Sequence, residues 1–400
     1  MILRFHKIPP SYCFLGNPIL FEVSGTAYEA IDIAITCAGN TYAQTYYPFL
    51  RTDGRYYSLI DVSGFLFKES TIHQYPTGAG YVIPFENHSI AYEVRILQAL
   101  EVENELGIVT GSEDYVFSGT ALPGGINEQL FGMLAENGKT IFDFRLSSKS
   151  CNFLFTTRTH SPDIHLRRSE MYPFLFIHPG GTISFLSGKG NSLEADSLSE
   201  KTVCLLDIYK VWDDFLSQYN EFASNIAVLV DGLESFRFTI RDSKEEDELY
   251  TLRFRNSLGA FEVIEVVGKA SNEPEFAEET TYKALTDYNY YETLKDRQGL
   301  VNKIKVSTGY KSRDDLLFIR DLICSDEVYF YYRDGSVFRC RVTADKMNFA
   351  NKLVTPTAVD LVVTEVGSGK FVTPEVTREM LERAGFDFNV FDETFDQTFN

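Results

Sequence analysis

The sequence has few methionines, a single tryptophan and no long apolar run. It contains 5 Met and 1 Trp in 400 residues. No segment approaches the roughly 18 apolar residues that a membrane-spanning helix needs, so we expect no membrane partner. Met1–Ser11 lacks the apolar core of a secretion signal. We therefore expect synthesis in the cytoplasm without a signal peptide.

Cysteine is also scarce, and its spacing forms no recognised motif. The six thiols stand at Cys13, Cys37, Cys151, Cys204, Cys324 and Cys340, and none belongs to a Cys-x-x-Cys pair. Six cysteines in a chain of this length do not make a disulfide scaffold. Cys37 and Cys204 lie inside apolar runs, so we expect buried free thiols.

Motifs of catalysis are missing. The chain has no glycine-rich nucleotide loop, no His-Glu-x-x-His and no Gly-x-Ser-x-Gly. His160, Asp163 and His165 are the best metal candidates, but their spacing fits no helical face and no further ligand is evident. With 57 acidic residues, any pair of carboxylates is unspecific. We predict no catalytic residue, no metal, no cofactor and no enzymatic activity.

Positive charge is in deficit. The chain has 37 basic and 57 acidic residues and a formal net charge of −20, and Arg167–Arg168 is its only adjacent basic pair. Such a field repels nucleic acids at long range. We expect no nucleic-acid partner, and the sequence does not define a small-molecule ligand.

Phenylalanine and tyrosine, in contrast, are abundant, with 33 and 23 copies. Both favour pleated, half-buried surfaces. Ile31, Ile33 and Ile35 alternate with polar or small residues, as on a strand with one buried face. Further strands are expected at 18–23, 56–62, 92–97, 153–158, 172–177, 182–186, 261–267 and 360–366. The sequence therefore predicts a mainly β, multi-domain array of β-sandwich modules with a few short helices.

Three helices and two hairpins are expected. Apolar residues recur at helical spacing from Ile208 to Phe222, Ser312 precedes a second helix, and Thr373-Pro374 opens a third that ends at Gly385. Asp334-Gly335 between Val328–Tyr332 and Val337–Val342 is a hairpin signal. A second hairpin is expected from 236–240 and 250–254, and residues 270–281 are expected to form a loop.

The modules are delimited by composition. Residues 118–125 are rich in glycine and predict a linker. We expect a β-sandwich over 1–118, a β module with a helix over 119–230, a mainly β region over 231–372, and a helix with an acidic, aromatic tail over 373–400. Tyr47–Leu50 and Leu59–Val62 are echoed by Tyr172–Leu175 and Leu205–Ile208, and a duplication of the first two modules is one explanation and chance another.

The tail is the most informative feature outside the strands. Phe391, Phe395 and Phe399 recur every four residues with acids between them. One interpretation is a charge-solvated terminus, and the other is a segment that binds a partner as an added strand or through aromatic anchors. We predict that these three phenylalanines bind a partner.

Several motifs resemble a family of structural proteins. They are Arg253–Glu262 with Gly268-Lys269, then Asp314–Ser325 leading into Glu327–Phe330, and Phe391–Phe395, with a looser echo in Asn17–Phe21 and Asp61–Ser63. Over 235–400 the chain resembles tail or baseplate proteins of Bacteroidetes phages and prophages. In that family an Asn-x-x-Gly-Gly turn follows the first strand, and here Gly259-Ala260 replaces the glycine pair. The resemblance implies a structural role and no site residues.

Three functions remain open. The leading hypothesis is a non-enzymatic component of a phage or prophage tail-type particle, bound to other subunits or to copies of itself and associated with the virion. The alternative is a carbohydrate-binding or surface-adhesion protein, which would bind its ligand through exposed aromatic side chains. A glycan or peptide hydrolase ranks third.

Overall fold

The computed structural model describes most of the chain. The described residues are 4–25, 30–52, 54–69, 75–76, 78, 80–104, 107–145, 154–158, 163–242, 249–272, 275–276, 281–287, 290–295, 300–311, 315–332, 336–344 and 357–366. Two compact units are present. Unit 1 comprises Met1–Thr156, Pro173–Arg237 and Ser257–Ala260, and unit 2 comprises Thr157–Tyr172, Phe238–Asn256 and Phe261–Asn400. The predicted four-part division stays a prediction.

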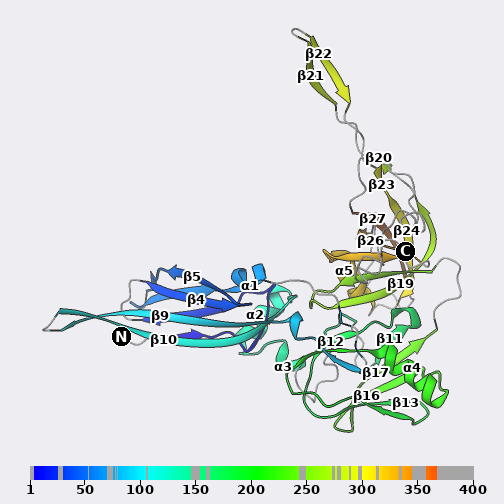
Figure 1. The fold of residues 1–400 in the computed structure, drawn as a ribbon, viewed down its shortest axis with the longest axis horizontal. Coiled ribbons are helices and arrows are strands. Elements are labelled where there is room, and N and C mark those ends of the chain that lie inside the picture. Colours follow the sequence, from blue (N-terminus) through cyan, green and yellow to red (C-terminus); the bar gives the residue numbers. More distant parts are fainter. Residues whose placement is uncertain are drawn as a thin grey trace, which may run out of the picture. The chain divides into compact units, whose positions relative to one another are not determined.

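Unit 1 opens with a β-sandwich (Figure 1). One sheet has the order β1 (Arg4–Lys7), β3 (Leu20–Gly25), β7 (Tyr56–Asp61), β6 (Phe49–Leu50). The other has the order β2 (Tyr12–Phe14), β10 (Gly107–Leu122), β9 (Ile90–Asn104), β4 (Ile31–Cys37), β5 (Asn40–Tyr46). Phe21 and Ile60 of the first sheet share one core with Ile33 and Val94 of the second. Each such burial contributes about 1.5–3 kcal/mol.

The remainder of unit 1 contains two smaller sheets and most of the helices. One sheet has the order β12 (Phe174–Ile177), β15 (Val203–Leu206), β8 (Val82–Pro84). The other contains β14 (Ser192–Glu194), β13 (Ile183–Ser187), β16 (Asn225–Val230) and the first half of β17 (Leu233–Arg241). The helices are α1 (Ser63–Glu69), α2 (Glu128–Glu136), α3 (Phe142–Arg145) and α4 (Ile208–Tyr219), with a 3-10 turn at Glu86–His88.

The helix predicted from Ile208 to Phe222 is confirmed as α4, which ends at Tyr219. The Asp207 carboxylate accepts a hydrogen bond from the Lys210 amide at 3.0 Å, which caps the first turn. Val211 and Phe215 lie on its buried face. Asn220, in the left-handed region at φ 50°, ends the helix.

Unit 2 is built on a closed antiparallel barrel of six strands. Their order is β18 (Leu249–Arg255), β19 (Phe261–Asn272), β24 (Lys303–Lys311), β27 (Thr357–Glu365), β26 (Val337–Thr343), β25 (Val328–Tyr331). Closure leaves the sheet without free edges. α5 (Asp315–Cys324) adds Phe318, Ile319 and Leu322 to the barrel core. The other elements are β11 (Asp163–Arg167), a 3-10 turn at Arg168–Glu170, β20 (Glu275–Phe276), β21 (Thr281–Asp287), β22 (Tyr290–Lys295) and β23 (Leu300–Val301).

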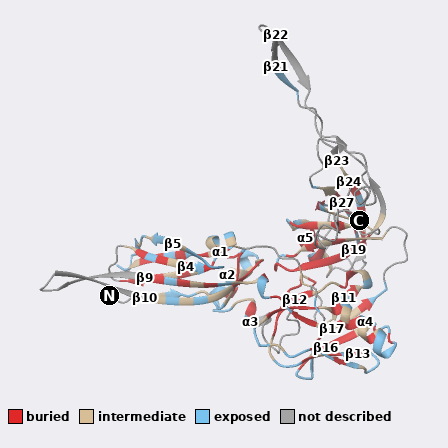
Figure 2. Ribbon diagram, viewed as in Figure 1, coloured by how far each residue is buried: buried red, intermediate tan, exposed pale blue. Residues whose placement is uncertain are grey.

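The strand pattern predicted from the sequence is confirmed, and the fold is mainly β. Buried and exposed residues alternate along β4, as Figure 2 shows. β25 and β26 form the expected antiparallel pair, while Asp334-Gly335 lies outside the described residues, as does the helix expected at 373–385. In the described part of the chain, no helix has the length and apolar character to cross a bilayer.

The hairpin expected from 236–240 and 250–254 is wrong. β17 lies beside β16, and β18 pairs with β19 and β25. The cause is a tight turn at Asp231-Gly232, where both residues have positive φ, 51° and 77°. Two positive φ values define the type I′ turn that joins neighbouring antiparallel strands. This turn returns the chain onto β16 before the charged bend is reached.

Three other local expectations are wrong. Residues 118–122 end β10 and are not a linker; a Cβ on Gly119 would meet the Tyr92 hydroxyl at 2.6 Å, so its small size allows close packing. In the expected strand at 153–158, the described part shows one isolated bridge, Leu154 to Phe176. The expected loop at 270–281 contains the end of β19 and β20.

Candidate functional site

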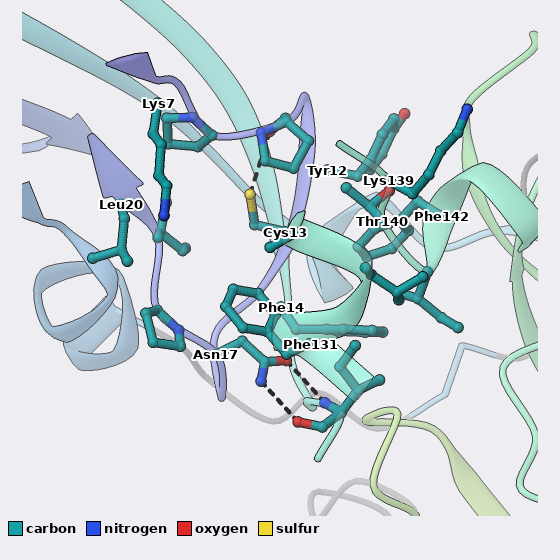
Figure 3. Close-up of a pocket in the computed structure, with 18 of the residues that line it drawn as sticks. Lys7, Tyr12, Cys13, Phe14, Asn17, Leu20, Phe131, Lys139, Thr140 and Phe142 are labelled. Atoms are coloured by element: carbon teal, nitrogen blue, oxygen red, sulfur yellow. Dashed lines mark hydrogen bonds between the residues drawn. The ribbon is translucent and has the colours of Figure 1, made fainter. Parts of the chain in front are cut away.

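Unit 1 contains a cavity of about 370 Å³, which we call the pocket (Figure 3). Three segments line it: part of residues 6–20, Ile126 with helix α2, and residues 138–142, which run from the end of α2 to the first residue of α3. Volumes of this size are typical of sites that hold a small ligand or a few side chains.

Hydrogen bonds fix the pocket walls. The Asn17 side chain donates to the Ile126 carbonyl and accepts from the Ile126 amide, both at 2.8 Å, and these bonds are dashed in Figure 3. The Asn127 side chain caps α2 by accepting from the Leu130 amide at 2.7 Å. Gly138, at φ 62°, turns the chain out of the helix and into the lining loop.

Aromatic rings line the pocket. The Phe142 ring centroid lies 4.8 Å from that of Phe14 and 5.8 Å from that of Tyr12. Phe131 of α2 also faces the cavity, and the Tyr12 hydroxyl donates to the Lys201 carbonyl at 2.8 Å. The lining is therefore suited to apolar and aromatic groups.

The charged side chains that line the pocket are basic. Lys7 and Lys139 are exposed and line it together with His6, and no carboxylate is among its lining residues in the described part of the chain. This is notable in a chain with a formal net charge of −20. An occupant with apolar and anionic groups would match both features.

The thiol in the pocket wall is not a nucleophile at neutral pH. Cys13 is buried, and its Sγ lies 3.3 Å from the Pro10 carbonyl and 3.7 Å from the Tyr92 hydroxyl. Burial raises its pKa to about 11, so the thiol stays protonated. Burial of the expected free thiols is confirmed for Cys13, Cys37, Cys204 and Cys340, whereas Cys324 is exposed and Cys151 lies outside the described residues.

A second feature of unit 1 is an apolar and aromatic patch on the four-stranded sheet. We define the sheet patch as Phe49, Arg51, Tyr57 and Leu59. Phe49 and Leu59 are 48% and 50% exposed. Phe49 lies opposite Tyr57 on the neighbouring strand, and the Arg51 guanidinium lies 4.0 Å from the centroid of the Tyr57 ring. Aromatic residues and arginine are enriched at protein interfaces.

Unit 2 contains a buried ionic network. The Arg158 guanidinium lies 3.4 Å from both the Glu170 and the Glu262 carboxylates. Arg167 donates to Glu265 at 2.6 Å. The three glutamates are each 2% exposed.

Hydrogen bonds saturate these carboxylates. Glu170 also accepts from the Glu265 amide at 2.9 Å, Glu262 from the Asn256 side chain at 2.6 Å, and Glu265 from Ser169 at 2.5 Å. Buried charges are tolerated when they are paired in this way. The network ties residues 157–158 and 163–172 to β19.

Aromatic rings of unit 2 surround the Arg253 guanidinium. Its guanidinium carbon lies 5.1 to 5.7 Å from four ring centroids, those of Tyr172, Phe261, Tyr329 and Tyr331. Cation–π contacts of this kind stabilise the fold. These four rings therefore contact a cation within the same unit.

The residues singled out by sequence have mixed outcomes. Phe391, Phe395 and Phe399 lie outside the described residues, as does His160. His165 is exposed on β11 beside the half-buried Asp163. Among the described residues, no group of three or more His, Cys, Asp or Glu is placed to hold a metal ion. Sequence reasoning missed the pocket, for which Pro9-Pro10 and the helix after Asn127 were the available local signals.

Comparison with known proteins assigns no family. No family model matches the chain, and no curated protein matches its sequence. Among solved structures, the Bacillus anthracis TIE protein aligns over 76% of this chain with 8% identity and a TM-score of 0.14. The alignment spans about half, 51%, of that protein. A TM-score this low assigns neither a fold nor a function.

Proposed function

We propose that this chain is a non-enzymatic structural protein that acts through protein–protein contacts, as a component of a phage or prophage tail-type particle. Its partners are other particle subunits or further copies of itself. The particle assignment rests on the sequence resemblance over 235–400.

The assembly function rests on one observation, the sheet patch. Phe49 and Leu59 expose about half of their surface on neighbouring strands, next to Arg51 and Tyr57. Tyr57 itself is buried at 7% exposed, so the exposed part of the patch is Phe49, Leu59 and Arg51, and side chains of these kinds occur at contact surfaces of soluble proteins. The buried acids of unit 2 are occupied by arginines and amides, which supports a structural role for them.

A paired substitution tests this proposal. The double variant Phe49→Ser, Leu59→Ser removes the apolar surface of the sheet patch and should weaken self-association or partner binding about tenfold or more, since each buried side chain contributes about 1.5–3 kcal/mol. Light scattering at matched concentrations measures the first quantity, and a pull-down measures the second.

A matched control separates the patch from general hydrophobicity. Phe222→Ser with Leu233→Ser removes one phenylalanine and one leucine that are 67% and 76% exposed elsewhere in unit 1. This control should associate like the wild type, and both variants should keep their melting temperatures. Equal association of the patch variant and the wild type would contradict the proposed role. Loss of association in glycan-containing buffer alone would favour the carbohydrate-binding alternative.

A further inference from the structure

The pocket of unit 1 and the last fifteen residues of the chain have complementary chemistry. We propose that the pocket binds residues 386–400 of a second copy of this chain. This inference rests on the proposed assembly function and identifies one of its contacts.

The pocket has space and charge for an acidic, aromatic segment. A cavity of about 150 Å³ holds one benzene ring, so about 370 Å³ accommodates two phenyl rings. Phe14, Phe131 and Phe142 supply the apolar lining. Lys7 and Lys139 line the same cavity and attract carboxylates.

The sequence of residues 386–400 contains the matching groups. It has five phenylalanines and four acids, with no lysine or arginine. Phe391, Phe395 and Phe399 are spaced by four, which places side chains on one face of either a strand or a helix. Asp392, Glu393 and Asp396 stand between them in the sequence and carry the charge opposite to that of the two lysines.

A pocket on one copy and a segment from another form a heterologous contact. Such contacts close into rings or extend into filaments, as a component of a tail-type particle requires. The sheet patch lies on different residues, so each contact can be removed while the other is kept.

A peptide of residues 386–400 labelled with fluorescein provides the probe. The receptor is the full chain with Phe391→Ser, Phe395→Ser and Phe399→Ser, so that its own tail does not compete. We expect a saturable rise in fluorescence anisotropy. A peptide with the same three substitutions should bind about tenfold or more weakly, because its apolar anchors are gone.

The pocket is tested by reversing its charge. Adding Lys7→Glu and Lys139→Glu to the receptor should weaken peptide binding several-fold. Adding Lys68→Glu and Lys189→Glu, which reverses two exposed lysines of unit 1 away from the pocket, should leave it unchanged. Equal binding by the two receptors, or no binding to either, would overturn the proposal.

The mass of the wild type distinguishes the remaining outcomes. If the peptide binds the pocket but the wild type stays monomeric, its own tail fills the pocket and the second-copy proposal is wrong. If the peptide fails while the sheet-patch variant still reduces self-association, the tail proposal falls and the assembly proposal stands.

Discussion

At the residue scale, a hydrogen bond from the backbone makes the fold sensitive to the protonation of the His178 side chain. The imidazole is 1% exposed, and its Nδ1 accepts a hydrogen bond from the Gly180 amide at 3.2 Å. A protonated Nδ1 cannot accept, and burial lowers the pKa of this histidine. This hydrogen bond therefore needs a neutral ring.

The consequence is a loss of stability in acid. Well above pH 6.5, the ordinary pKa of histidine, the imidazole is neutral in both the folded and the unfolded chain. Below that pH the unfolded chain binds the proton first, because the folded pKa is lower, so the free energy of unfolding decreases. His178→Asn offers an amide oxygen in place of Nδ1 and should flatten this decrease. Urea midpoints at pH 7.5 and pH 5 measure it.

The exposed His165 is the control for this effect. His165→Asn makes the same substitution at an exposed histidine and measures the effect of the substitution type itself. An unchanged slope in His178→Asn would show that other groups cause the acid sensitivity.

At the scale of elements, strand propensity predicts where strands form, while turns and buried charges determine which segments lie beside one another. The alternation at Ile31, Ile33 and Ile35 and the helical spacing that starts at Ile208 were predicted from the sequence because both patterns are local. The turn at Asp231-Gly232 was also readable, and it carries the same dipeptide as the expected hairpin at Asp334-Gly335. The pocket and the Arg158 network were not readable, because residues far apart in sequence build them.

The two pairs of similar motifs, which led to the duplication hypothesis, also show how far local sequence predicts strand pairing. Phe49-Leu50 and Phe174-Leu175 both begin strands that pair with a later strand, and a helix follows that strand in each case. The registers differ, however: Phe49 lies opposite Tyr57, two residues before the echoed Leu59, and Phe174 lies opposite Leu206, one residue after the echoed Leu205. Duplication stays a hypothesis.

Replacing the buried Arg158 should reduce stability more than replacing an exposed arginine. Arg158→Met leaves Glu170 and Glu262 without their shared cation and should destabilise unit 2 by about 3–5 kcal/mol. Native-state hydrogen exchange of the β19 amides measures this locally. Arg237→Met, which breaks the exposed pair with Glu234, should cost less than about 1 kcal/mol. Similar costs for both would contradict the assigned role of the network.

At the scale of the whole molecule, the described apolar side chains divide between two cores and a number of exposed surfaces. Apolar side chains fill the sandwich core and the barrel core, and arginines occupy the buried acids described in unit 2. Two of the surfaces that remain accessible on the described part of unit 1 are the sheet patch and the basic pocket. An acidic chain with such surfaces is suited to defined contacts with proteins, because its net charge of −20 opposes unspecific association.

Sedimentation velocity over a hundredfold range of concentration tests the assembly function most directly. We predict that the mean mass rises well above the 45.5 kDa of one chain, or does so once a protein partner recovered by pull-down is added. A mass that stays at one chain throughout, with no protein recovered, would contradict the account.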